Sequence, residues 1–119
     1  MDVKWIEHKG RRILYVDYRG AKNEEEMLSV LYKSNEEEKA SSEKVTVLAN
    51  FENTYASSKY MDEVNRLGKE VTKNIVDKTA LIGIVGIKKI LVNSFIRFTG
   101  DNNLKIFDNE DNAKEWLVS

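Results

Sequence analysis

The sequence contains no cysteine and no proline, and His8 is the single histidine among its 119 residues. Without cysteine the chain cannot form disulfides or use thiol chemistry, and it lacks the commonest zinc ligands. The 19 lysines and arginines nearly balance the 20 aspartates and glutamates, so the net charge of −1 gives no basic surface for nucleic acid. The composition therefore predicts a protein without a metal site, a cofactor or a nucleic-acid partner.

Long hydrophobic runs are also absent. The most apolar stretch is Ala80–Gly100, but its continuous apolar part is only Ala80–Ile87, because Lys88, Lys89 and Arg97 interrupt the rest. A bilayer span needs roughly 20 apolar residues. The N-terminal segment is charged and lacks the apolar core of a signal peptide. We therefore expect a protein that is not transmembrane and that is located in the cytoplasm.

The length suits a single domain over residues 1–119, and the strand pattern predicts its class. Two β-rich segments lie on either side of a tight turn at Gly10, which predicts an antiparallel hairpin. Strands and helices then alternate, which predicts parallel strands with right-handed crossovers. The result is an α/β fold with a mixed five-stranded sheet and four helices. The predicted strands are Val3–His8, Ile13–Gly20, Lys44–Phe51, Thr79–Gly86 and Leu104–Asp108.

The first helix is predicted to begin after an N-cap at Asn23, with Glu26 in the position of a capping-box partner. Its apolar stripe ends at Leu31, so we expect the helix to fray beyond that point and the charges of Glu36–Lys39 to form a solvated face. The other helices are predicted over Ser58–Val76, over Ile87–Thr99 with a stop at Gly100, and after a cap at Asp108, with Ala113, Trp116 and Leu117 on the apolar face.

The segments ALIGIVGIKKIL and LKIFDNEDNAKEWL resemble the STAS-like superfamily, which is named after sulfate transporters and anti-sigma-factor antagonists. The resemblance is to its branch of small stand-alone proteins, which is also compared with CRAL-TRIO lipid-exchange domains. In that branch a glycine leads from the fourth strand into a lysine-bearing helix, and a strand ending in Phe precedes an acidic turn, an Ala and a Trp-Leu pair. The resemblance implies a STAS-like α/β fold and a regulatory or interaction role. The matching residues are Phe107, Ala113, Trp116 and Leu117.

Anti-sigma-factor antagonists carry an Asp-Ser-Ser-Gly motif where the third strand meets the second helix, and a kinase phosphorylates its first serine. The comparable residues here are Ala56, Ser57, Ser58 and Lys59, so the serines match and the Asp and Gly do not. Serine hydroxyls at this position would cap the helix. The alternative is a phosphosite at Ser57 or Ser58, since a helix N-terminus stabilises a phosphate.

No set of residues predicts catalysis. His8 lies on an edge hairpin without a nucleophile motif beside it. Gly83 and Gly86 lack the spacing of a nucleotide-binding loop, so we interpret them as a close strand-to-helix junction. We therefore expect a protein that is not an enzyme.

The helix Ile87–Thr99 is more apolar than packing on one sheet requires. At about 100° per residue, one apolar side is expected to pack on the sheet; its members are Ile87, Ile90, Leu91, Ser94 and Phe98. The apolar residues left over predict an interaction surface for a protein partner or a second copy of the chain. They are Val92, Phe95 and Ile96.

Lys88 and Lys89 fall in the first turn of this helix, where cations oppose the helix dipole. They are either solvated surface lysines or, with the free backbone N–H groups, an anion-binding site. The second interpretation predicts an alternative function, in which Lys88 and Lys89 hold the head group of a small apolar or lipid-like anionic ligand and the same helix holds its tail.

Overall fold

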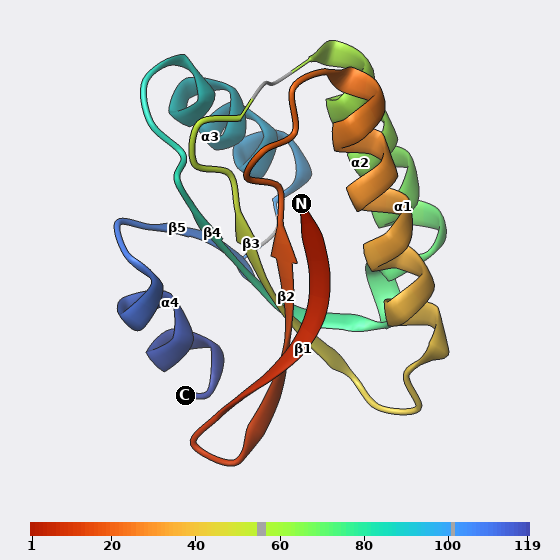
Figure 1. The fold of residues 1–119 in the computed structure, drawn as a ribbon, viewed down its shortest axis with the longest axis vertical. Helices are drawn as coiled ribbons and strands as arrows, with labels where there is room; N and C mark the ends of the chain where they lie inside the picture. The colour runs from red at the N-terminus through yellow and green to blue at the C-terminus, as the bar shows by residue number, and fades with distance from the viewer. Residues whose placement is uncertain (55–56, 101) are drawn as a thin grey trace.

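The structure is a computed structural model that describes residues 1–54, 57–100 and 102–119 (Figure 1). Five strands form one sheet in the order β1-β2-β3-β4-β5, in which β1 and β2 are antiparallel and the other neighbours are parallel. The mixed α/β fold predicted from the sequence is thereby confirmed. The strands are β1 (Asp2–His8), β2 (Arg11–Asp17), β3 (Val45–Asn50), β4 (Val76–Ile82) and β5 (Leu104–Phe107), and the helices are α1 (Glu24–Ala40), α2 (Ser58–Glu70), the 3-10 helix η1 (Thr72–Asn74), α3 (Ile87–Thr99) and α4 (Glu110–Leu117).

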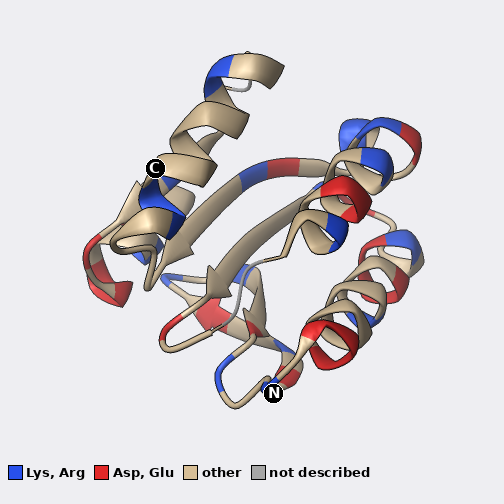
Figure 2. Cartoon of the chain, turned by 90° about the horizontal axis from the view of Figure 1, so that it is seen from above, with Lys and Arg blue, Asp and Glu red and all other residues tan. Residues whose placement is uncertain are grey.

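The order of the strands decides where the helices lie. Since each new parallel strand is added on the same side of the last, right-handed crossovers bring α1, α2 and α3 to one face of the sheet. The core on that face joins Val16 and Val47 of the sheet to Met27 of α1 and Leu67 of α2. The core on the other face packs only against α4, through Ala113 and other residues. Figures 1 and 2 show α4 apart from α1 and α2.

The caps and ends of the helices follow local sequence signals, with small shifts. Asn23 caps α1 as predicted, because its Oδ1 accepts from the Glu26 N–H at 2.9 Å. The Glu26 carboxylate accepts from the N–H of Lys22. The predicted cap of α4 at Asp108 is wrong by one residue, since the Asn109 side chain accepts from the Asn112 N–H.

Two predicted boundaries are also wrong. Helix α2 ends at Glu70 and not at Val76, because the chain turns through η1 and Val76 already begins β4. β4 in turn ends at Ile82, so the segment up to Gly86 is a connection to α3 and not strand.

Helix α1 is longer than predicted. It continues to Ala40, so the predicted fraying beyond Leu31 is wrong, and the solvated face over Glu36–Lys39 is found only in part, because Glu36 and Lys39 are exposed but Glu38 is buried. Ser34, Asn35 and Glu38 are instead 4–5% exposed. Residues 31, 34, 35 and 38 follow the spacing of one helix face, so the buried stripe continues with polar side chains. A search for apolar periodicity does not detect such a stripe.

Burial declines steadily along the shared sheet face. Helix α1 has seven buried residues, α2 has two, and α3 has none. The predicted orientation of α3 is wrong, since the residues expected on the sheet are exposed: Ile87 (73%), Ile90 (66%), Leu91 (45%) and Phe98 (81%), together with Ser94. The half-buried residues are Lys88, Val92, Phe95 and Ile96. Both sides of this helix are apolar, so its periodicity did not decide which side faces inward. In Figure 2, α3 is almost wholly tan with a few blue positions.

Gly83 fixes the path of the chain from β4 into α3. Its φ is +78°, and a Cβ at this position would overlap the backbone N of Glu52 and lie 2.8 Å from the carbonyl carbon of Phe51. Only glycine therefore allows the two backbone segments to lie so close. The close contact at Gly83 is with the segment after β3, whereas a Cβ at Gly86 would have no atom within 4 Å, so the predicted close strand-to-helix junction is not found as such.

We expect Gly83→Ala to lower the free energy of unfolding by about 3 kcal/mol or more, because a left-handed backbone costs roughly 1–2 kcal/mol and a forced overlap roughly 1–3 kcal/mol. Gly10→Ala is the matched control, since Gly10 has φ +79° but no atom near its would-be Cβ. Gly10→Ala should lower the free energy of unfolding only by the cost of the left-handed backbone, about 1–2 kcal/mol. Urea denaturation of both variants measures the difference, and equal losses would contradict the steric explanation.

Candidate functional site

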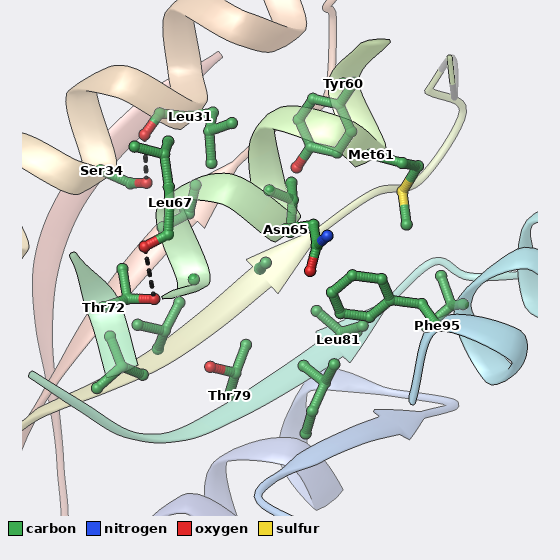
Figure 3. A pocket seen from close by; sticks show the side chains of 18 of the residues that line it. Leu31, Ser34, Tyr60, Met61, Asn65, Leu67, Thr72, Thr79, Leu81 and Phe95 are labelled. Carbon is green, nitrogen blue, oxygen red and sulfur yellow. Dashed lines mark hydrogen bonds between the residues drawn. The ribbon is translucent and has the colours of Figure 1, made fainter. Parts of the chain in front are cut away.

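A cavity of about 720 Å³ lies between α2 and α3, over the sheet face that the three crossover helices share (Figure 3). It exists because α3 contributes no buried residue and so leaves space that α1 and α2 do not fill. Ligand pockets usually have volumes of about 300–1,000 Å³ and mainly apolar walls. The apolar lining includes Val16, Val47, Ala49 and Leu81 from the sheet, Met27 and Leu31 from α1, Val64 and Leu67 from α2, and Val92 and Phe95 from α3.

Two of the three residues predicted as an interaction surface face this cavity. Val92 packs against the main core, and in Figure 3 the Phe95 ring extends from α3 toward Asn65 and Leu81. Ile96 is half-buried and lines a smaller hollow between α3 and β5. Whether these residues bind a partner stays a prediction, and two of the exposed apolar residues of α3, Ile87 and Ile90, do not line the cavity.

The two lysines predicted as an anion site line different hollows. Lys88 lines the cavity, and its Nζ donates to the carbonyl oxygen of Phe51 at 2.9 Å. Partial burial lowers the pKa of Lys88. Lys89 is exposed and lines the small hollow beside β5. Lys88 is therefore the lysine in a position to contact a group within the cavity.

An aromatic cluster closes the cavity near the carboxyl ends of β2 and β3. The rings of Tyr18 and Phe51 stack with centroids 4.5 Å apart, and the Tyr60 ring meets both edge to face. Burial raises the pKa of both tyrosines, so their hydroxyls stay neutral at physiological pH. Among the described residues, this end of the cavity is thus aromatic and uncharged, apart from Lys88.

Buried polar side chains from α1 also line the cavity. Ser34 Oγ and Asn35 Nδ2 both donate to the carbonyl oxygen of Leu31, at 2.8 and 3.3 Å. Asn35 Oδ1 and Glu38 Oε2 are buried and have no hydrogen-bond partner among the described residues. Burial raises the pKa of Glu38 to about 7. Apolar periodicity does not reveal this group, because its members after Leu31 are polar; only their helical spacing, at residues 31, 34, 35 and 38, relates them to the apolar stripe.

The remaining candidates have structural contacts. Ser57 Oγ accepts from the Tyr60 N–H at 3.1 Å, so the capping interpretation is confirmed for Ser57. Ser58 is exposed in the first turn of α2, while Ala56 lies outside the described residues. Phosphorylation of either serine stays a prediction. His8 Nε2 lies 3.4 Å from Glu115 Oε1 at the molecular surface.

Within the described ranges, no three or more His, Asp or Glu side chains gather as metal ligands would. No helix in the described part of the chain has both the length and the apolar character needed to cross a membrane.

The fold and the site together define an α/β protein with a mixed sheet and a ligand-sized apolar cavity on its three-helix face. Comparison with protein-family models, with curated proteins and with solved structures finds no match. The STAS-like resemblance therefore stays a prediction from the sequence.

Glu38 should make stability depend on pH. Its pKa in the folded state is about 7 and its ordinary value is 4.5, so between these values the folded state holds a proton that the unfolded state has lost. Stability therefore falls as the pH rises through this window. Glu38→Gln cannot ionise, so we expect it to match the parent near pH 4.5 and to exceed it by about 3 kcal/mol above pH 7, at about 1.4 kcal/mol per pH unit.

Urea denaturation at several pH values between 4.5 and 8 measures this difference. Glu36→Gln is the control, because Glu36 is exposed on the same helix and pairs with Lys39. Its stability should run parallel to that of the parent at every pH. Parallel curves for Glu38→Gln would contradict the raised pKa.

Proposed function

We propose that this chain is a non-enzymatic, STAS-like cytoplasmic domain that binds a small, mainly apolar ligand in the cavity between α2 and α3. The observation that carries the proposal is α3 itself, which has no buried residue yet directs Val92 and Phe95 toward about 720 Å³ of space. Protein interiors are normally close-packed, and the lining of an empty space loses its dispersion contacts. A ligand that fills the cavity would restore those contacts.

The composition of the cavity favours a small molecule over a protein segment. Its walls are mainly aliphatic and aromatic, with a few polar groups at separate places, as in sites that bury most of a small ligand. A partner docked on the outer side of α3 would leave this space unfilled. The resemblance to proteins that are compared with CRAL-TRIO domains supports the same class of ligand, by analogy of fold.

Lys88 supports an anionic group on the ligand. Its ammonium is partly desolvated, and among the described residues its hydrogen-bond partner is the neutral Phe51 carbonyl alone. The N-terminus of α3 begins at Gly86 without a side-chain cap, so backbone N–H groups of the first turn add positive potential. Lys89 adds charge to the same turn from its exposed position. A carboxylate or phosphate of a lipid-like ligand fits beside Lys88.

Gly68 offers a way to fill the cavity without straining the backbone. It lines the cavity within α2, and a Cβ added there would meet only Thr72 Oγ1 at 3.9 Å. We expect Gly68→Leu to weaken binding of an anionic apolar dye, anilinonaphthalene sulfonate, at least tenfold, because the new side chain occupies the site. Stability should not fall, since replacing a helical glycine favours the helix by roughly 0.5–1 kcal/mol.

Gly68→Ala is the matched control, because it gains the helix preference but fills little space. It should bind the dye like the parent, while Lys88→Met should bind it more weakly. Fluorescence titration of the native proteins measures all four affinities. The proposal fails if the parent shows no saturable binding of the dye or of a medium-chain fatty acid.

A second candidate function is association with a protein partner or with a second copy of this chain through the outer side of α3. Its support is the exposure of Ile87 and Ile90, which point away from the cavity, and of Val85 just before the helix. Adjoining exposed apolar residues are typical of interaction surfaces. These residues, and not Val92 and Phe95, would be the anchors.

For the self-association version, we expect the double variant Ile87→Ser, Ile90→Glu to be monomeric at concentrations where the parent forms dimers. Sedimentation equilibrium measures this. The variant should unfold within about 0.5 kcal/mol of the parent, because both side chains are exposed. Ser42→Glu adds the same charge at an exposed position outside α3, in the loop between α1 and β3, and should leave the dimer intact. A parent that stays monomeric at high concentration excludes self-association.

A further inference from the structure

The unpartnered oxygens of Asn35 and Glu38 lie on one face of α1. The two residues are three positions apart, so their side chains are neighbours on the helix surface. Each residue is 5% exposed, and both line the cavity. Asn35 Oδ1 and Glu38 Oε2 have no hydrogen-bond partner in the part of the chain that the structure describes. Buried polar atoms in native proteins nearly always have one, so this pair calls for an explanation.

Both atoms require a donor that α1 does not supply. The Leu31 carbonyl can only accept, so the Asn35 amide must turn its Nδ2 toward Leu31 and leave Oδ1 without a partner. The Ser34 hydroxyl donates to the same carbonyl and is therefore already used. No ion pair of the described residues includes Glu38, and desolvation is the cause of its raised pKa. Lys88, which also lines the cavity, donates a hydrogen bond to the carbonyl oxygen of Phe51. The other charged residues around the cavity are exposed: Lys69, Lys73 and Asp77.

Lys88 and Glu38 belong to different ends of the sheet face. Lys88 contacts Phe51, directly after the carboxyl end of β3. Glu38 lies in the last turn of α1, which leads into the start of β3. The space between the two polar groups is mainly apolar and suits a chain-like ligand body.

We propose that Asn35 and Glu38 form a subsite for a hydrogen-bond-donating group, a hydroxyl or an amine, at the end of the ligand remote from Lys88. This inference rests on the proposed function and narrows its ligand class. The ligand is then an amphiphile with an acidic group at one end, an apolar chain, and a donor at the other end. A hydroxyl donates to either oxygen, while an ammonium also pairs with ionised Glu38.

The test uses four fatty acids of one chain length that differ only at the far end: methyl, ω-hydroxy, ω-amino and ω-methoxy. Their affinities for the intact protein are measured by displacement of the bound dye. We expect the ω-hydroxy or the ω-amino acid to bind at least tenfold more tightly than the methyl-ended acid. The ω-methoxy acid accepts hydrogen bonds but cannot donate them, so it should gain nothing. Comparing the affinities of the ω-hydroxy and ω-amino acids shows whether the subsite prefers a neutral or a cationic hydrogen-bond donor.

The variants Asn35→Leu and Glu38→Met should abolish the preference for the donor-ended acid over the methyl-ended acid. Glu36→Met changes an exposed carboxylate of the same helix and should leave the preference unchanged. If Asn35→Leu does not fold, Glu38→Gln gives the second measurement, since it should remove any advantage of the ω-amino over the ω-hydroxy acid. Circular dichroism checks the fold of each variant.

The outcomes separate this inference from the proposed function. Equal binding of all four acids by the parent, or a donor preference that survives in both variants, overturns the subsite and leaves the apolar cavity as a binding site. Solvent water then satisfies the two oxygens. Binding of none of the four acids overturns the proposed function itself.

Discussion

Packing against one face of the sheet is the constraint on which the rest of the structure depends. Strands β2 to β5 are added in sequence order, so right-handed crossovers bring three helices to the same face. Helices α1 and α2 fill the part of that face nearest to β2 and β3 with their buried side chains. Helix α3 lies beside β5 and has no buried residue. The cavity therefore arises because the three helices on this face bury unequal numbers of side chains.

On the opposite face of the sheet, helix α4 packs closely against the strands. In the described part of the chain α4 alone covers it, yet Ala113 and Leu117 are 0% and 2% exposed. The Trp116 ring packs on Phe107, and Lys78 Nζ donates to the Trp116 carbonyl at 3.1 Å. This arrangement fixes the C-terminus to the sheet. The two faces thus divide the molecule into a structural side and a side with room for binding.

The features that lower stability lie on the face with the cavity. The side chains around an apolar cavity lose dispersion contacts. Burial without a partner disfavours the charged form of a carboxyl group such as that of Glu38. Departures from good packing and from polar satisfaction are common at functional sites, because the groups concerned are arranged for a ligand and not for the free protein. In this chain both departures occur around one cavity, which is the reason for regarding it as a site.

The sequence by itself determined the order of the elements, the class of the fold and the caps at Asn23 and Ser57. These features depend on residues within a few positions of one another, such as a cap and the N–H group it accepts from. The rotation of α3, the length of α1 and the burial of Glu38 were decided only by the tertiary structure. Helix α3 is apolar on two sides and α1 buries polar residues, so neither pattern identifies the inward side. Burial depends on which neighbours the topology supplies, and residues distant in the sequence supply them.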